Sequence, residues 1–159
     1  MNRRTFIAAS GVAASLLAAD QNIPVGLELF SVRGELMKDL MGTVRSVGKL
    51  GYRVVEFYAP YMQWTPAYAR DVRKMLDDSG LECRSTHNSP DSFGAAMGKA
   101  IELNQIIGSK TIVMASPGQS KTIDDWKRIA AMLASGAEKF KNQGMRAGYH
   151  NHGAEWKAI

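Results

Sequence analysis

The chain repeats one unit from residue 23 onward: a short apolar run rich in β-branched residues, followed by a stretch with helical periodicity. Successive runs start 28 to 35 residues apart, which is the length of a strand, a helix and their connections. Because parallel strands need a crossover segment between them, the repeat predicts a parallel sheet in the α/β class. Five strands are expected, at residues 23–30, 53–58, 81–86, 110–115 and 145–150.

Four helices are expected between these strands. Apolar residues recur at three- and four-residue steps in each, as on the buried face of a helix, over residues 36–50, 66–76, 92–107 and 122–140. Thr122 and Asp125 match a capping box in which aspartate replaces the usual glutamate, and this pattern marks the start of the last helix. A glycine in the left-handed conformation is expected to follow each helix and lead into the next strand: Gly51, Gly80, Gly108 and Gly144.

Two architectures accommodate five parallel strands and four helices. A doubly wound sheet fits the length but calls for a final helix, and an eight-stranded barrel needs about 250 residues. Polar residues recur near the carboxyl end of nearly every strand, and a barrel gathers such residues around one axis. We therefore expect one domain over residues 20–159 that holds the first five strands of a barrel, truncated after the fifth.

Residues 1–19 differ from the rest of the chain. Arg3 and Arg4 precede a weakly apolar segment, residues 8–19, and the whole resembles a twin-arginine export signal. The expectation is transport of the folded protein to the periplasm and removal of the signal. A membrane-spanning helix needs roughly 20 apolar residues, so no stable membrane insertion is expected afterwards. The alternative is an N-terminal amphipathic helix.

The charge of the chain argues against nucleic acid as a partner. The formal net charge is +5, and removal of residues 1–19 leaves +3, which is too small for a nucleic-acid-binding surface. Basic residues alternate with acids on the expected helices, which predicts solvated faces. The lone cysteine, Cys83, lies inside an expected strand and is predicted to be a core residue. Glycine-rich nucleotide-binding motifs and the Gly-x-Ser-x-Gly motif are absent from the sequence.

The candidate site residues lie near the carboxyl ends of the expected strands. Glu56 is flanked by apolar residues, and a buried carboxylate is costly without a partner, so we assign it to a site. For Glu28, the alternative to a site role is an ion pair with a basic neighbour. For His87, just past the third strand, the alternative is a structural hydrogen bond. His150 and His152 occupy alternate positions at the fifth strand, so their side chains can point the same way, toward a ligand or a metal.

A histidine pair alone is a small part of a metal site, which normally has three or four donors. Three segments of the sequence are more informative. Residues 25–33 (VGLELFSVR), 51–58 (GYRVVEFY) and 148–156 (GYHNHGAEW) resemble the sugar phosphate isomerase/epimerase family, which has the xylose isomerase-like TIM barrel. The resemblance implies one divalent metal, Mn²⁺ or Zn²⁺, and proton transfer beside a carbonyl of a sugar or cyclitol.

The resemblance also implies roles for individual residues. His150 takes the place of a metal-binding glutamate on strand five of many relatives, a change that alters the charge of the site, and Asn151 matches its neighbour. Glu56 and His150 are expected to be catalytic, and His150 and His152 to bind the metal. Contacts with the sugar are expected from Glu28, His87, Asn151 and His152. The ligands that relatives carry on strands six to eight have no counterpart, so this chain alone is expected to have an incomplete site and little or no turnover.

Other functions remain open at this point. A lyase or dehydratase would begin with the same proton abstraction. A non-catalytic carbohydrate-binding barrel would need no metal. A metal-dependent endonuclease on the same barrel calls for more histidines and a stronger basic face than three histidines and a charge of +3 provide. Whether the chain is itself an enzyme, its substrate and its oligomeric state are not fixed by the sequence.

Overall fold

Five parallel strands form the only sheet in the part of the chain that the computed structural model describes, residues 23–118 and 120–156. The expected export signal lies outside these residues. The order in the sheet is the order in the sequence, from one edge to the other. The strands are β1 (Gly26–Glu28), β2 (Val54–Phe57), β3 (Glu82–Asn88), β4 (Thr111–Met114) and β5 (Arg146–Tyr149).

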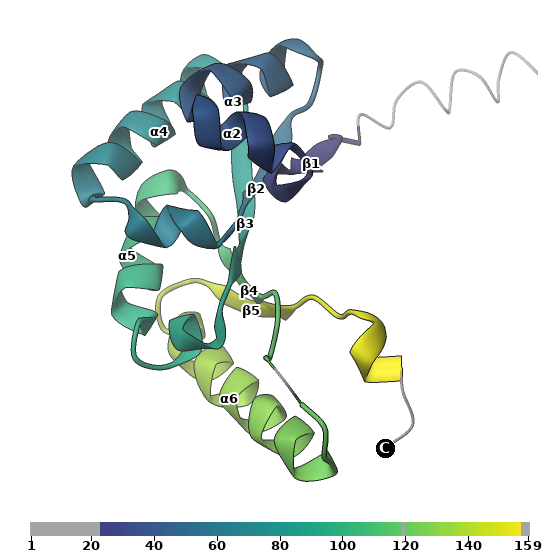
Figure 1. Cartoon of the computed structure of the whole chain (residues 1–159). Coiled ribbons are helices and arrows are strands. Elements are labelled where there is room, and N and C mark those ends of the chain that lie inside the picture. Colours follow the sequence, from purple (N-terminus) through teal and green to yellow (C-terminus); the bar gives the residue numbers. More distant parts are fainter. Residues whose placement is uncertain (1–22, 119, 157–159) are drawn as a thin grey trace, which may run out of the picture.

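The helices lie on one side of this curved sheet (Figure 1). A doubly wound sheet reverses its strand order and carries helices on both faces, whereas sequential order with helices outside is the barrel arrangement. The structure therefore confirms the barrel alternative. The helices are α2 (Arg33–Lys38), α3 (Leu40–Lys49), α4 (Pro66–Asp78), α5 (Met97–Ile107) and α6 (Ile123–Lys141), with 3₁₀ turns η1 (Leu29–Val32), η2 (Ala59–Gln63), η3 (Pro90–Phe93) and η4 (Gly153–Trp156).

Two expected elements are divided or shortened by side-chain caps. The helix expected over 36–50 is two helices, because Asp39 has extended backbone and its carboxylate accepts the Gly42 N–H at 2.9 Å. The first strand ends at Glu28, whose carboxylate accepts the Phe30 N–H at 3.0 Å and starts η1. Such local hydrogen bonds compete with a continuous helix or strand.

The expected turn chemistry is confirmed. Gly51, Gly80, Gly108 and Gly144 all have φ between +64° and +99°, a region that glycine enters without steric cost. The capping box of α6 is also present: Thr122 accepts the Asp125 N–H, and the Asp125 carboxylate accepts the Thr122 N–H. The third expected helix begins later than 92, at Met97, because Pro90–Phe93 form a separate 3₁₀ turn.

The core fills the space between the sheet and the helices. Val55 and Phe57 of β2 pack under α3 and α4, and Ile112 and Met114 of β4 pack with Phe140 of α6. Cys83 is buried there, as expected. Burial raises the pKa of its thiol to about 12, so the sulfur stays protonated and unreactive at neutral pH.

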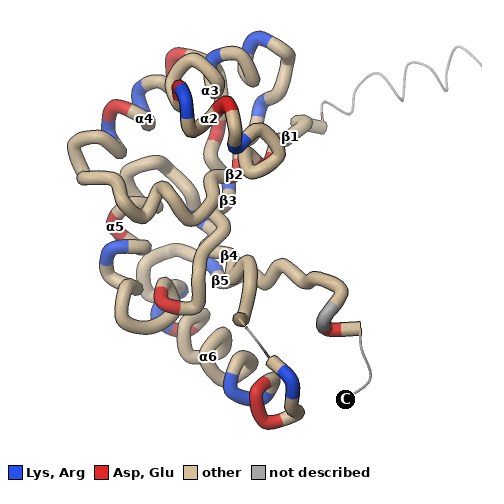
Figure 2. Tube along the Cα trace, viewed as in Figure 1, with Lys and Arg blue, Asp and Glu red and all other residues tan. Residues whose placement is uncertain are grey.

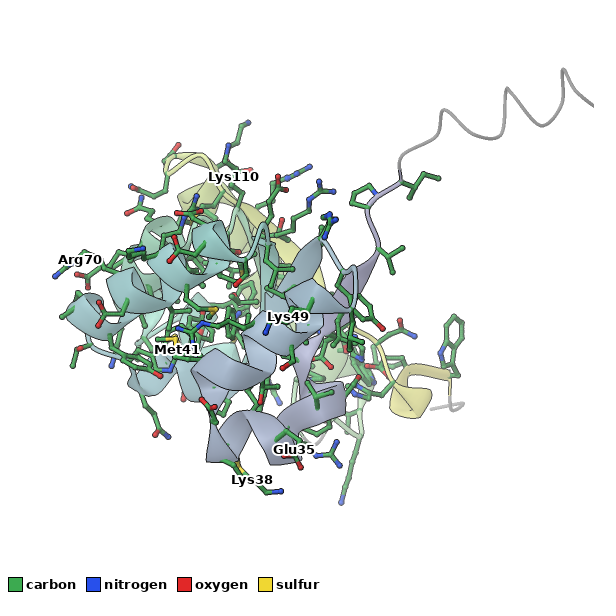
Figure 3. All side chains as sticks on the ribbon, turned by 90° about the horizontal axis from the view of Figure 1, so that it is seen from above. Glu35, Lys38, Met41, Lys49, Arg70 and Lys110 are labelled. Carbon is green, nitrogen blue, oxygen red and sulfur yellow. The ribbon has the colours of Figure 1, made fainter. Side chains whose placement is uncertain are left out.

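Lys, Arg, Asp and Glu residues are distributed along the helices, with basic and acidic positions interspersed (Figure 2). On α4, Arg73 pairs with Asp77 at 2.8 Å and Lys74 with Asp78 at 2.6 Å. Arg70 projects away from the core (Figure 3). These exposed pairs confirm the solvated faces expected from the sequence, and each contributes little to stability. Within residues 23–118 and 120–156, no helix combines the length and the apolar character that crossing a bilayer requires.

Candidate functional site

A β-bulge in β3 decides which side chains face the site. Val55 of β2 pairs with Cys83, but the next residue, Glu56, pairs with Ser85, so Arg84 is an extra residue in β3. In a regular strand, Cys83, Ser85 and His87 would share one face. The extra residue turns Ser85 and His87 away from the buried side of Cys83, toward Glu56.

The structure also corrects the limits of this strand. The sequence prediction ended the third strand at residue 86 and placed His87 in the following loop. β3 continues to Asn88, so His87 is held within the sheet. The sequence carries no local signal for the extra residue, because the bulge is set by pairing with β2.

Glu28, Glu56 and His87 meet at the carboxyl ends of three adjacent strands. Their metal-binding atoms all lie within 4.8 Å of one another. Nε2 of His87 is 3.0 Å from Oε1 of Glu56, and Nδ1 of His87 is 3.9 Å from Oε1 of Glu28. All three side chains are partly buried, with exposed fractions of 30% for Glu28, 20% for Glu56 and 13% for His87. We call these three residues the carboxylate–histidine triad.

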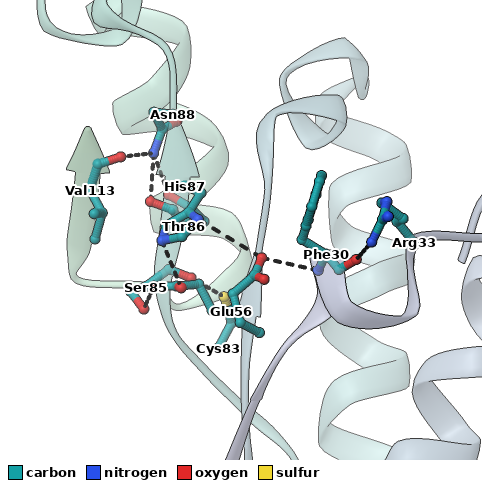
Figure 4. A network of polar contacts seen from close by, with 10 residues as sticks. Phe30, Arg33, Glu56, Cys83, Ser85, Thr86, His87, Asn88 and Val113 are labelled. Carbon is teal, nitrogen blue, oxygen red and sulfur yellow. Dashed lines mark hydrogen bonds and ion pairs between the residues drawn. The ribbon is translucent and has the colours of Figure 1, made fainter. Parts of the chain in front are cut away.

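Both carboxylates of the triad are oriented by neighbours. The Ser85 hydroxyl donates a hydrogen bond to Oε2 of Glu56, and the Phe30 N–H donates one to Oε1 of Glu28 at 3.0 Å. Figure 4 shows Ser85, His87 and Glu56 directed toward one another. Glu28 and Glu56 are register partners on adjacent strands, where two like charges repel each other. A cation between them would remove this repulsion.

The donor set of the triad fits a divalent metal ion. Carboxylate oxygens are ligands for Mg²⁺ and Mn²⁺, and imidazole suits Zn²⁺ as well as other transition metals. Three protein donors leave coordination positions for water or substrate, as catalytic sites require. Of these residues, the sequence assigned Glu56 to catalysis and Glu28 and His87 to the substrate, and did not foresee them as one group.

His150 and His152 lie beside the triad. The ring centroid of His150 is 4.7 Å from that of His87 and 4.7 Å from that of His152, so the three imidazoles form a row. The expected fifth strand included His150, but β5 ends at Tyr149, and His150, Asn151 and His152 belong to the exposed loop that follows. The structure thus brings the predicted site residues to one end of the sheet. Metal binding by His150 and His152 stays a prediction.

Glu155 anchors this loop, a role that the sequence did not indicate. Its carboxylate accepts hydrogen bonds from the Tyr149 hydroxyl and, at 2.9 Å, from the His152 N–H. The bond from Tyr149 lowers the pKa of Glu155, and burial together with the Glu155 charge raises the pKa of Tyr149. Both side chains therefore keep the protonation states that this contact needs at neutral pH.

A cavity of about 720 Å³ lies at the other end of the sheet. Its lining includes the first residues of three strands, Glu82, Thr111 and Arg146, and none of the triad. Ligands of parallel βα folds bind at the carboxyl ends of the strands. We therefore place the candidate site at the triad and not in this cavity.

No protein-family model and no curated protein matches this sequence. Several solved structures match the fold of the chain. A sugar phosphate isomerase/epimerase from Parabacteroides distasonis superposes with a TM-score of 0.71 at 24% identity, over 86% of this chain and 53% of that one. The chain has the fold of a partial xylose isomerase-like TIM barrel.

Two further structures carry the same fold. A D-psicose 3-epimerase, solved in the presence of D-fructose, matches with a TM-score of 0.57 at 16% identity, over 69% of this chain and 45% of that one. A xylose isomerase-like TIM barrel protein from Mycobacterium smegmatis, in complex with magnesium, matches with a TM-score of 0.56 at 14% identity and the same coverages. The chain spans about half the length of these barrels. At these identities the comparisons show the fold, and the fold hosts more than one chemistry.

Proposed function

We propose that the protein is a metal-dependent isomerase or epimerase that moves a proton beside a carbonyl of a sugar or cyclitol. The observation that carries the proposal is the triad, in which two carboxylates and an imidazole converge at the carboxyl ends of three barrel strands. The sugar isomerase and epimerase names of structures with this fold add support. The activity is assigned to the whole barrel, of which this chain supplies five strands.

In this proposal Glu28, Glu56 and His87 hold a divalent metal, Mn²⁺ or Zn²⁺. A metal bound there would supply Lewis-acid polarisation of the substrate's oxygens, which would acidify the C–H bond beside the carbonyl. Glu56 is better suited to holding the metal than to moving the proton, because Ser85 and His87 already contact its carboxylate oxygens. This differs from the catalytic role that the sequence suggested for Glu56.

We assign proton transfer to His150. Its exposed imidazole lies beside His87, and histidine is the side chain that most often serves as a general base. Asn151 and His152, exposed on the same loop, are proposed to hydrogen-bond the substrate hydroxyls. Glu155 holds this loop in place through the Tyr149 hydroxyl and the His152 N–H.

The test is hydrogen exchange at carbon in deuterated water. A polypeptide that completes the barrel is incubated with Mn²⁺ and a panel of ketoses and cyclitol ketones, and deuterium uptake beside the carbonyl is followed by NMR. We expect uptake that EDTA abolishes and that His150→Ala reduces by about 100-fold, the size of a general-base contribution. Asp91→Asn, an exposed change in η3, is the control. Metal-independent sugar binding without exchange would contradict the proposal and favour a carbohydrate-binding barrel, and an elimination product would favour a lyase.

We further propose export to the periplasm by the twin-arginine route. The support is the sequence of residues 1–19, with Arg3 and Arg4 before a short apolar segment. Replacing both arginines by lysine should keep the protein in the cytoplasmic fraction while the unaltered protein reaches the periplasm, as measured by fractionation. Equal periplasmic amounts of the two forms would rule out this route.

A further inference from the structure

A buried polar cluster lies on the helix-facing side of β3, directly behind the triad. Tyr61, Thr86, Asn88 and Asn104 are each no more than 1% exposed, in a layer whose buried residues are mostly apolar. Ser92, also buried there, donates a hydrogen bond to Oδ1 of Asn88 at 3.3 Å. Burying so many polar groups is costly unless every one is hydrogen-bonded. We call Tyr61, Thr86, Asn88 and Asn104 the β3 anchor.

The β3 anchor forms one connected network. The Tyr61 hydroxyl donates to Oδ1 of Asn88 at 2.5 Å and accepts from Nδ2 of Asn104 at 2.8 Å. The Thr86 hydroxyl donates to Oδ1 of Asn104 at 2.9 Å and accepts from Nδ2 of Asn88 at 2.9 Å. Among the described residues, no buried side-chain nitrogen or oxygen lacks a partner. A fully satisfied network of this kind holds its members in one arrangement.

The network ties β3 to two elements outside the sheet. Tyr61 comes from η2, after β2, and Asn104 comes from α5, after β3. Nδ2 of Asn88 also donates to the carbonyl of Thr86 at 2.7 Å, a contact visible in Figure 4. The end of β3 is thus fixed by directional bonds, whereas apolar packing alone would tolerate a slip along the sheet.

His87 lies between the two β3 members of the anchor, Thr86 and Asn88. Successive side chains of a strand point to opposite faces, so fixing Thr86 and Asn88 on the helix side directs His87 to the site. Without the bulge, Thr86 and Asn88 would face the site and His87 the core. That arrangement would leave the polar groups of Tyr61 and Asn104 buried without these partners, at a large cost.

We infer that Tyr61, Thr86, Asn88 and Asn104 are positioning residues that hold β3 in its bulged register and aim His87 at Glu28 and Glu56. The inference rests on the proposed function in taking His87 as a metal ligand. The network itself touches neither Glu28 nor Glu56, so its effect on the site passes through the backbone of β3.

The decisive variants are Thr86→Val and Thr86→Ser. Valine has nearly the shape of threonine but removes the hydroxyl, whereas serine keeps it. Calorimetric titration with Mn²⁺ should show binding weakened by about 10-fold or more in Thr86→Val and close to unaltered binding in Thr86→Ser. Tyr61→Phe, which keeps the ring in the core, should behave like Thr86→Val.

Ile112→Val is the matched control. Ile112 is the register partner of Thr86 on β4, is fully buried on the same side of the sheet, and carries no polar group. It should lower the stability against urea without weakening Mn²⁺ binding. Equal weakening in Ile112→Val and Thr86→Val would show that general destabilisation is responsible and would overturn the inference.

The second measurement needs no metal. The imidazole ¹⁵N–¹H NMR signals of His87 report its contact with Glu56, and with three histidines in the chain they can be assigned by single substitutions. Thr86→Val and Tyr61→Phe should shift these signals and Thr86→Ser should not. Unchanged signals in both hydroxyl-deleting variants would refute the positioning role. If the signals shift as expected but the unaltered protein binds no Mn²⁺, the proposed function fails and the positioning role stands.

Discussion

Replacing Glu56 by glutamine is expected to weaken Mn²⁺ binding by more than about 100-fold, because changes beside metal ligands already cost 10- to 100-fold. Glu56 is the middle residue of the triad and contacts both His87, at 3.0 Å, and Ser85. Glutamine has nearly the same shape, so the loss reports the charge and the second oxygen. Calorimetric titration measures the affinity, and deuterium uptake by the sugar should fall with it.

In the metal-free protein, the same substitution should not lower the stability of the fold. Glu28 and Glu56 are register partners, and removing one of two adjacent like charges relieves repulsion. Without metal, Glu56→Gln should therefore be at least as stable against urea as the unaltered protein. Glu82→Gln is the control, since Glu82 is an exposed carboxylate of the same sheet, paired with Arg84 at 3.1 Å. Retention of full Mn²⁺ affinity in Glu56→Gln would move the metal site elsewhere, with His150 and His152 as the next candidates.

Replacing Phe140 by alanine is expected to destabilise the fold by about 3–5 kcal/mol. Phe140 projects from α6 into the cluster with Ile112 and Met114, is fully buried, and contacts the Phe93 ring edge-on with centroids 5.3 Å apart. Truncation leaves a cavity that the surrounding strands fill only in part. Since domains have roughly 5–15 kcal/mol of stability in total, a large part of the fold's stability would be lost.

Urea unfolding followed by circular dichroism measures this loss. Met132→Ala is the matched control, because Met132 lies on the same helix but is 38% exposed, and its truncation should cost far less. Similar losses in the two variants would mean that α6 does not pack on β4 through Phe140.

The repeat of strands and helices could be predicted because its signals are local. Apolar periodicity located the elements, and glycines such as Gly108 and Gly144 marked their junctions by a backbone conformation that other residues avoid. Glu56 could be assigned to a site for a similar reason, since a carboxylate among valines and phenylalanine is costly without a partner.

What the sequence missed depends on pairing between distant segments. Cys83, Ser85 and His87 follow the regular alternation of a strand, so nothing in their order indicates that Arg84 is an extra residue. The meeting of Glu28 with His87 likewise depends on how β1, β2 and β3 align. Asp39 shows a different limit: its cap is local, but the apolar spacing on both sides of it continues as if one helix were present.

The extra residue in β3 makes this segment an exception to the rule that a one-residue deletion exchanges the two faces of a strand. Deleting Arg84 would make Cys83 and Ser85 consecutive residues on opposite faces, as Val55 and Glu56 are on β2. Thr86, His87 and Asn88 would keep their present pairing and faces. A β3 shortened by this one residue would be a regular strand that still directs His87 to the site, so descendants of this protein could lose the bulge and keep the triad.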